Sequence, residues 1–152
     1  MTAPADHESL RVWLRLFTCT TLIERTIGSA LKREFESSLP RFDLLAQLER
    51  APKGLRMGEL SERILTTGGN VTWLVRALEA DGLVTRRISA KDKRAAVVRL
   101  TPTGRRRFAA MASAHERWII AMFSSLAPAD RRALHSLLGT LKEQFRPPRI
   151  SK

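Results

Sequence analysis

The feature that most constrains the fold of this sequence is a change of hydrophobic period at Gly82. Before this glycine, from Gly68 to Asp81, apolar residues recur every three or four positions, as they do on one face of a helix. After it, two β-rich runs at 83–88 and 96–101 frame a polar segment, which is the pattern of a β-hairpin. Gly82 suits the left-handed position just past a helix end. The centre of the chain is therefore expected to be a helix followed by a hairpin, here named the wing (83–101).

A shorter helical pattern precedes this helix, from Gly58 to Leu65. Thr66 and Thr67 separate the two patterns, and their hydroxyls suit the N-cap of the second helix. Two short helices around a tight turn indicate a helix-turn-helix. A further helix is expected to open at Pro40 and to stop before Pro52, because proline disfavours the helical conformation of the residue before it.

Long amphipathic helices are expected at both ends of the chain. Apolar residues keep a helical period over 10–35, and Thr101 and Pro102 suit the N-cap and first position of another long helix, with a last one after Pro128. The fold class is then mainly α with a small β-hairpin wing. We expect one domain, 1–152, with a winged helix-turn-helix lobe at 40–101 and flanking helices at 8–38 and 102–146.

The flanking helices carry more apolar surface than one small domain can cover. Pairing them with the same helices of a second copy would bury that surface in a two-fold interface, so 8–38 and 102–146 are predicted to be dimerisation helices. A monomeric bundle that folds back on itself is the alternative.

The charge balance favours a polyanionic partner. The chain has 27 Lys and Arg against 15 Asp and Glu, a formal net charge of +12. A solvated basic face is the ordinary explanation of a charge run, but the concentration on one hairpin favours nucleic acid. Around the wing, nine basic residues accompany one acidic residue, Asp92: Arg86, Arg87, Lys91, Lys93, Arg94, Arg99, Arg105, Arg106 and Arg107.

The helix from Gly68 to Asp81 has an outward face of base-reading residue types. With Val71, Leu74, Val75 and Leu78 turned inward, Asn70, Trp73 and Arg76 face outward, with Gly69 and Thr72 beside them. Asparagine can pair with adenine, arginine with guanine, and a threonine methyl with thymine. For Trp73, semi-buried packing is at least as good an explanation as base contact.

Several function classes are disfavoured. The longest apolar runs fall short of the ~18 residues of a membrane span, and the start of the chain lacks the regions of a signal peptide, so a cytoplasmic location is expected. One cysteine and three unclustered histidines predict no metal and no cofactor. The common phosphate-loop, dinucleotide and zinc-protease motifs do not occur, so no enzyme activity is expected.

The lobe closely resembles the MarR (multiple antibiotic resistance regulator) family of winged helix-turn-helix transcription regulators. The resemblance rests on the spacing of three motifs and on the order of the flanking helices. The three motifs are Leu78-Glu79-Ala80-Asp81-Gly82-Leu83-Val84, Asp92-Lys93-Arg94, and Leu100-Thr101-Pro102-Thr103-Gly104. Leu60-Ser61-Glu62, upstream of them, also fits the family.

The resemblance implies a homodimeric repressor on a pseudo-palindromic site in double-stranded DNA. The recognition helix would enter the major groove, Arg94 would reach the minor groove, and Asp92 would steady the wing by pairing with a nearby arginine. A ligand-independent architectural or constitutive DNA-binding protein is the alternative. The predicted DNA-binding residues are Thr67, Gly69, Asn70, Thr72, Trp73, Arg76, Arg86, Lys91, Asp92, Lys93 and Arg94.

Many members of this family respond to small anionic or phenolic ligands. Residues 39–50 are similar to those of members that control degradation of aromatic acids through coenzyme A thioesters, so an aromatic carboxylate or its thioester is the effector considered. Trp13, Phe17 and Trp118 lie on core stripes, where dimer packing is a more common role than ligand binding. The predicted ligand-binding residues are Arg11, Trp13, Arg15, Phe17, Arg41, Phe42, His115 and Trp118.

Cys19 invites comparison with peroxide sensors that carry a cysteine on the first helix. Those sensors use tyrosines to hold the thiol, and this chain contains no tyrosine. Cys19 is therefore predicted to be a small buried packing residue, with thiolate formation beside basic groups as the alternative.

Overall fold

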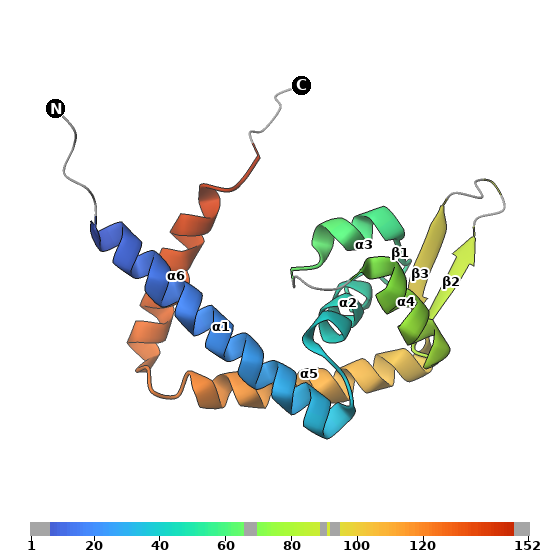
Figure 1. Ribbon diagram of the computed structural model, residues 1–152, viewed down its shortest axis with the longest axis horizontal. Coiled ribbons are helices and arrows are strands. Elements are labelled where there is room, and N and C mark those ends of the chain that lie inside the picture. Colours follow the sequence, from blue (N-terminus) through green and yellow to red (C-terminus); the bar gives the residue numbers. More distant parts are fainter. Residues whose placement is uncertain (1–6, 66–69, 89–90, 92–94, 148–152) are drawn as a thin grey trace. The chain divides into compact units, whose positions relative to one another are not determined.

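The computed structural model describes residues 7–65, 70–88, 91 and 95–147. These fall into two compact units, the first ending at His115 and the second beginning at Glu116. The mainly helical fold class with a small β-hairpin is confirmed. In chain order (Figure 1) the elements are α1 His7–Phe35, α2 Leu39–Glu49, β1 Leu55–Arg56, α3 Met57–Arg63, α4 Val71–Ala80, β2 Val84–Ile88, β3 Ala96–Leu100, α5 Pro102–Met122 and α6 Pro128–Glu143.

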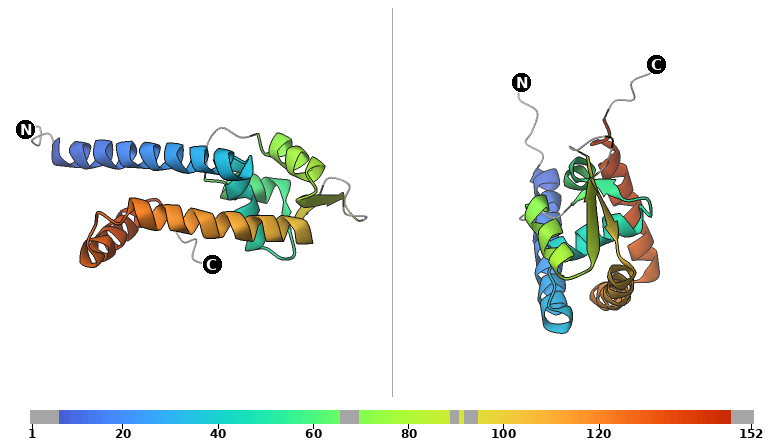
Figure 2. Two further views of the ribbon diagram at one scale, coloured as in Figure 1. Left: turned by 90° about the horizontal axis from the view of Figure 1, so that it is seen from below. Right: turned by 90° about the vertical axis from the view of Figure 1, so that its right-hand side faces the viewer.

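The strands form one antiparallel sheet in the order β1-β3-β2. The wing strands β2 and β3 pair from Val84 opposite Leu100 to Ile88 opposite Ala96. The short strand β1, which the sequence pattern did not predict, places Leu55 opposite Val98, and both side chains are buried. In the left view of Figure 2 the two wing strands extend beyond α4. The added strand β1 thus anchors the wing hairpin to the rest of the sheet.

The core of the first unit is built on α2. Leu44, Leu45 and Leu48 of this helix are fully buried, together with Leu60 of α3 and Leu78 of α4. Ser38 caps the start of α2, since its side chain accepts a hydrogen bond from the backbone N–H of Arg41. Helix α2 is therefore the platform on which both helices of the helix-turn-helix pack. From α1, the buried residues come from the C-terminal half alone: Ile27, Ala30 and Leu31.

The end of α4 has the geometry that its glycine predicts. Gly82 has a φ of 74°, a left-handed value that a residue with a Cβ adopts at a cost. Its N–H donates to the carbonyl of Glu79 at 3.0 Å, and the N–H of Leu83 donates to that of Leu78 at 2.9 Å. This pair of bonds is a Schellman motif, and it turns the chain directly from α4 into β2.

The start of α5 is fastened to that same turn. The hydroxyl of Thr101 accepts a hydrogen bond from the N–H of Gly104 at 2.9 Å, as the predicted N-cap should, and donates one to the carbonyl of Gly82 at 2.7 Å. The N–H of Thr101 also donates to the carbonyl of Leu83 at 3.0 Å. The end of α4 and the start of α5 are therefore held at one point.

The predicted start of α4 is wrong by three residues. The helix begins at Val71, and its N-cap is Asn70, whose side chain accepts a hydrogen bond from the N–H of Trp73. The predicted caps Thr66 and Thr67 and the predicted first residue, Gly68, lie outside the described residues. An asparagine at residue 70 competes well for the cap because Asn ranks with Ser and Asp at that position.

The second unit, described over 116–147, contains the end of α5 and helix α6. As expected for an alanine before the first proline of a helix, Ala127 starts α6 without a side-chain cap. Arg131 closes the preceding turn by donating to the carbonyl of Leu126 at 2.7 Å. Within the part of the chain that is described, none of the helices has the length and apolarity to cross a membrane.

Replacing Gly104 by alanine should destabilise the fold by about 3 kcal/mol, because overpacking of a rigid site is costly. A Cβ built at Gly104 would lie 1.9 Å from the carbonyl oxygen of Leu83, which is backbone and cannot swing away. Gly28→Ala in α1 is the matched control, since a Cβ there meets nothing within 4 Å; it should stabilise by up to about 1 kcal/mol. Urea unfolding checks both, and equal effects would contradict the close approach.

Candidate nucleic-acid interface

The outward face of α4 is presented to solvent as predicted. Leu74, Val75 and Leu78 are buried against the core, while Thr72, Trp73 and Arg76 are exposed. Trp73 is 65% exposed, so semi-buried packing within this chain is wrong for this side chain. An indole, a guanidinium and a hydroxyl therefore share the accessible side of a helix whose other side is buried in the core.

Asn70 has a different position from the one expected. As the N-cap it precedes the helix, and its Oδ1 accepts the hydrogen bond from Trp73 N–H at 3.3 Å. Bidentate pairing with adenine needs the side-chain oxygen as an acceptor as well as the nitrogen as a donor. The cap bond uses one of the two lone pairs of this oxygen and fixes the side chain at the first turn of α4.

The wing places some of its predicted residues at the surface. Of these, Lys91 is exposed and Arg86 is half-buried on β2. Arg87, which belongs to the basic cluster but not to the predicted DNA contacts, is also exposed. β1 pairs with β3 at Val97 and Val98, and the Thr101 hydroxyl binds the Gly82 carbonyl at the base of the wing. The predicted residues Thr67, Gly69, Asp92, Lys93 and Arg94 lie outside the described residues.

Three arginines of the basic cluster make contacts inside the chain. Arg99 donates from Nε to the carbonyl of Lys53 at 2.8 Å, and Arg105 pairs with Glu49 at 3.1 Å. Arg107 donates to the carbonyl of Phe35 at 2.6 Å and lies over its ring. These side chains tie β3 to the turn after α2 and tie α5 to α1 and α2, a structural use that the charge count could not separate from DNA contact.

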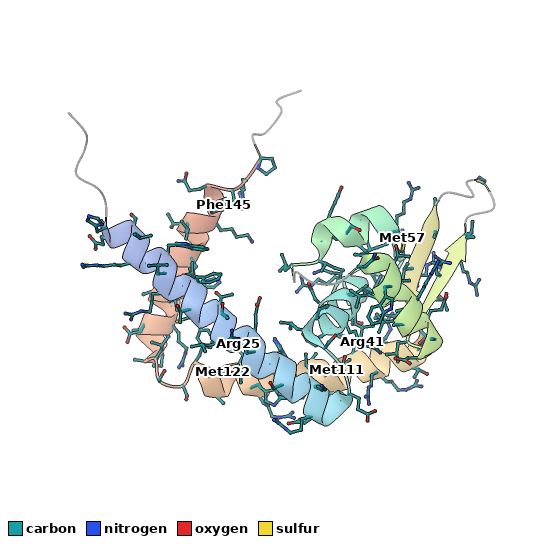
Figure 3. All side chains as sticks on the ribbon, viewed as in Figure 1. Arg25, Arg41, Met57, Met111, Met122 and Phe145 are labelled. Atoms are coloured by element: carbon teal, nitrogen blue, oxygen red, sulfur yellow. The ribbon has the colours of Figure 1, made fainter. Side chains whose placement is uncertain are left out.

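The predicted ligand residues of α2 lie beside α5. The ring of Phe42 packs against those of His115, at 4.8 Å between centroids, and Phe108, at 5.4 Å. Burial lowers the pKa of His115 below its ordinary 6.5, because the charged imidazolium loses water contacts there. Arg41, labelled in Figure 3, reaches from α2 to Asp81 at the end of α4 and forms an ion pair with it. The structure therefore brings Phe42 and His115 together, whereas Arg41 is turned to α4.

The predicted residues of α1 are on an exposed stretch. Arg11, Trp13, Arg15 and Phe17 are all exposed, and the rings of Trp13 and Phe17 lie 5.6 Å apart. Cys19 is also exposed, so the prediction of a buried packing residue is wrong for the single chain. Helical periodicity gives the faces of a helix but not which of them is covered. In the second unit, Trp118 is half-buried.

A surface hollow of about 350 Å³ lies between the start of α3 and the start of β3 and contains none of the predicted ligand residues. No cluster of three metal-ligating side chains occurs among the residues described. The hollow is lined by Arg56, Met57, Gly58, Glu59, Glu62, Ala95 and Ala96.

Comparison with known proteins identifies the class. A family model described as MarR family matches residues 38–95. The HTH-type transcriptional regulator YkoM of Bacillus subtilis is 30% identical over 129 residues, 84% of this chain and 80% of YkoM. The HTH-type transcriptional repressor YetL of the same organism is 27% identical over 147 residues, 94% of this chain and 86% of YetL.

Solved structures agree with this assignment. A MarR family transcriptional regulator from Silicibacter pomeroyi is 30% identical, with a TM-score of 0.81 over 95% of this chain and 100% of that one. Sco3205 of Streptomyces coelicolor, a MarR family regulator solved in complex with DNA, is 25% identical, with a TM-score of 0.81 over 97% of this chain and 94% of that one. The chain belongs to the MarR family of winged helix-turn-helix transcriptional regulators, a family of regulators and not of enzymes.

Acidification should destabilise the protein through His115. Because its pKa is lowered in the folded state, the unfolded chain binds the proton more readily, and stability is lost as the pH falls below about 6.5. The measurement is the change in free energy of unfolding between about pH 7.5 and pH 5.5. That change should shrink in His115→Gln and persist in the matched control His135→Gln, a substitution at an exposed histidine of α6. Equal changes in both variants would contradict the assignment.

Proposed function

We propose that this chain regulates transcription by reading double-stranded DNA with α4 in the major groove and the wing in the minor groove. The observation that carries the proposal is the division of α4 into a buried apolar side and an exposed side with Thr72, Trp73 and Arg76. Arg87 and Lys91 extend the basic surface along the wing. The likeness to Sco3205, which was solved in complex with DNA, supports this arrangement. A regulator of promoter DNA would work in the cytoplasm.

We further propose that the regulator is a homodimer formed by α1, α5 and α6. In the first unit, α1 exposes Leu10, Trp13, Leu14 and Phe17, a stripe that a single chain leaves in water. A two-fold pair would present two copies of α4 to half-sites about 34 Å apart, one turn of DNA, which makes a pseudo-palindromic operator the expected target. In the second unit, Phe145 is exposed just after α6, and α6 itself exposes four leucines: Leu134, Leu137, Leu138 and Leu141.

Repression is the proposed outcome of binding, and a small anionic aromatic ligand or its coenzyme A thioester the proposed release signal. The similarity to YetL, named a transcriptional repressor, supports the first part. The second part rests on the contact between the rings of Phe42 and His115 and on the exposed arginines Arg11 and Arg15 of α1. Control of aromatic-compound catabolism would follow from such an effector.

A constitutive, ligand-independent DNA-binding protein is the second candidate. Two observations favour it: Arg41 is paired with Asp81, and the hollow beside α3 includes none of the predicted ligand residues. The two candidates share the DNA-binding lobe and differ in whether the protein responds to a small molecule.

Arg76→Ala should weaken binding to a duplex that the protein selects from a random-sequence pool by about 1–3 kcal/mol, as expected for loss of a base contact. Arg105→Gln is the matched control. It removes the same charge from a side chain that is paired with Glu49, so a smaller loss is expected. Fluorescence anisotropy gives both affinities. Failure of the wild-type protein to select any sequence would reject sequence-specific regulation, and an unchanged affinity of Arg76→Ala would remove this face of α4 from the contact.

Ligand response separates the two candidates. An effector at about 100 times its dissociation constant should stabilise the free protein by about 2.7 kcal/mol, and it should release the selected duplex. The probes are benzoate, hydroxybenzoates and their coenzyme A thioesters, and benzamide is the uncharged control. Thermal unfolding and anisotropy report the two effects. No shift and no release with any of these probes would favour the ligand-independent protein.

A further inference from the structure

Asp43 is an unusual member of the core. Among the residues that the structure describes, it is the charged residue that is buried, and it lies on α2 beside the fully buried Leu44 and Leu45. A carboxylate in such a place is costly unless hydrogen bonds replace its water. An apolar side chain of similar size would commonly make a core more stable. A position of this kind calls for a specific hydrogen-bonding role.

The carboxylate of Asp43 holds the chain where α3 gives way to the turn of the helix-turn-helix. Its Oδ2 accepts a hydrogen bond from the backbone N–H of Leu65 at 2.7 Å, and its Oδ1 accepts one from Nε2 of Gln47 at 3.3 Å. The first bond joins residues 22 positions apart, while the second stays within α2. Hydrogen bonds to an ionised acceptor are roughly twice as strong as neutral ones.

Leu65 is not held in place by packing of its side chain. The leucine is 86% exposed, and it follows Ile64, which has left the helical conformation at the C-cap of α3. A backbone segment with an exposed side chain would be loosely held by apolar contacts alone. The bond from Leu65 N–H to the Asp43 carboxylate is therefore a principal restraint at the point from which the chain leads to α4.

The other end of α4 is tied to the same helix. Arg41, two residues before Asp43, forms its ion pair with Asp81, the C-cap of α4. Asp81 is half exposed, so water screens this pair and its energy is small. Helix α2 thus holds the chain before α4 through a buried charged hydrogen bond and after α4 through a weaker, surface ion pair.

We propose that Asp43 is a positioning residue for base recognition, which sets the placement of α4 by fixing Leu65. The proposal rests on the proposed function, because it assumes that α4 reads bases. A shift of the reading helix would misalign base contacts, which need defined geometry, more than phosphate contacts, which tolerate displacement. Loss of Asp43 should then reduce discrimination between sequences, beyond any loss of stability.

The test compares Asp43→Ala and Asp43→Asn with Gln47→Ala as the matched control. Gln47→Ala removes another hydrogen bond to the same carboxylate and leaves the bond to Leu65 in place. Each variant is measured by the ratio of its affinities for the wild-type-selected duplex and for a scrambled duplex. Amide hydrogen exchange at Leu65 in the free protein and the thermal midpoint are measured alongside.

Asp43→Ala should lower the affinity ratio roughly ten- to hundredfold, the loss expected for an unsatisfied or misplaced charged hydrogen bond. Asp43→Asn, which keeps an acceptor oxygen, should recover part of the ratio, and Gln47→Ala should stay within about twofold of the wild type. Exchange at Leu65 should accelerate in Asp43→Ala and less in Asp43→Asn.

An affinity ratio in Asp43→Ala equal to that of the wild type, with a lowered thermal midpoint, would overturn the proposal and leave Asp43 a purely stabilising residue. If Asp43→Ala does not fold, the affinity ratio of Asp43→Asn is compared with that of the wild type in its place. A wild-type protein that selects no sequence would reject the proposed function instead. In that case, unchanged exchange at Leu65 in the Asp43 variants would also show that Asp43 does not restrain Leu65. Faster exchange would support that restraint.

Discussion

The hydroxyl of Thr101 is the interaction on which the arrangement of the DNA-reading elements depends. One oxygen donates to the carbonyl of Gly82 and accepts from the N–H of Gly104, while the backbone of Thr101 binds Leu83. The last turn of α4, the first residue before β2 and the first turn of α5 are thereby fastened together. The missing side chain of Gly104 permits the close approach to Leu83 that this junction requires. A change in the direction of α5 would therefore act directly on the base of the wing and the end of α4.

Helix α2 forms the second connection between these elements. Three consecutive residues point to three neighbours, since successive helical residues are about 100° apart: Arg41 to Asp81, Phe42 to the rings of α5, and Asp43 to Leu65. Phe42 and the charged residues on each side of it cannot move independently in a rigid helix. The aromatic contacts of α5 and the placement of α4 are thus mechanically linked through a single turn of α2.

The sequence was sufficient for features with a local chemical cause. The left-handed Gly82, the Thr101 cap and the uncapped start of α6 were all predictable, because each depends on neighbouring residues. The two-residue strand β1 was not, since its pairing with β3 joins segments more than forty residues apart and leaves no periodic pattern. The role of Asp43 was hidden for the same reason, as its partner Leu65 is 22 residues away. Periodicity also could not tell that the faces of α1 that carry Trp13 and Cys19 are exposed in one chain.

The basic cluster illustrates a related distinction between charge and contact. The sequence counts each arginine near the wing equally, but Arg105 is neutralised by Glu49, whereas Arg99 and Arg107 bind carbonyl oxygens that carry no net charge. Arg99 and Arg107 therefore still add to the long-range field that attracts a polyanion, although one donor atom of each is bonded within the fold. Arg87, on β2, is an exposed basic side chain of the same cluster. Since the salt dependence of binding follows the number of phosphates neutralised, it should reflect the contacts made with DNA and not the formal charge of +12.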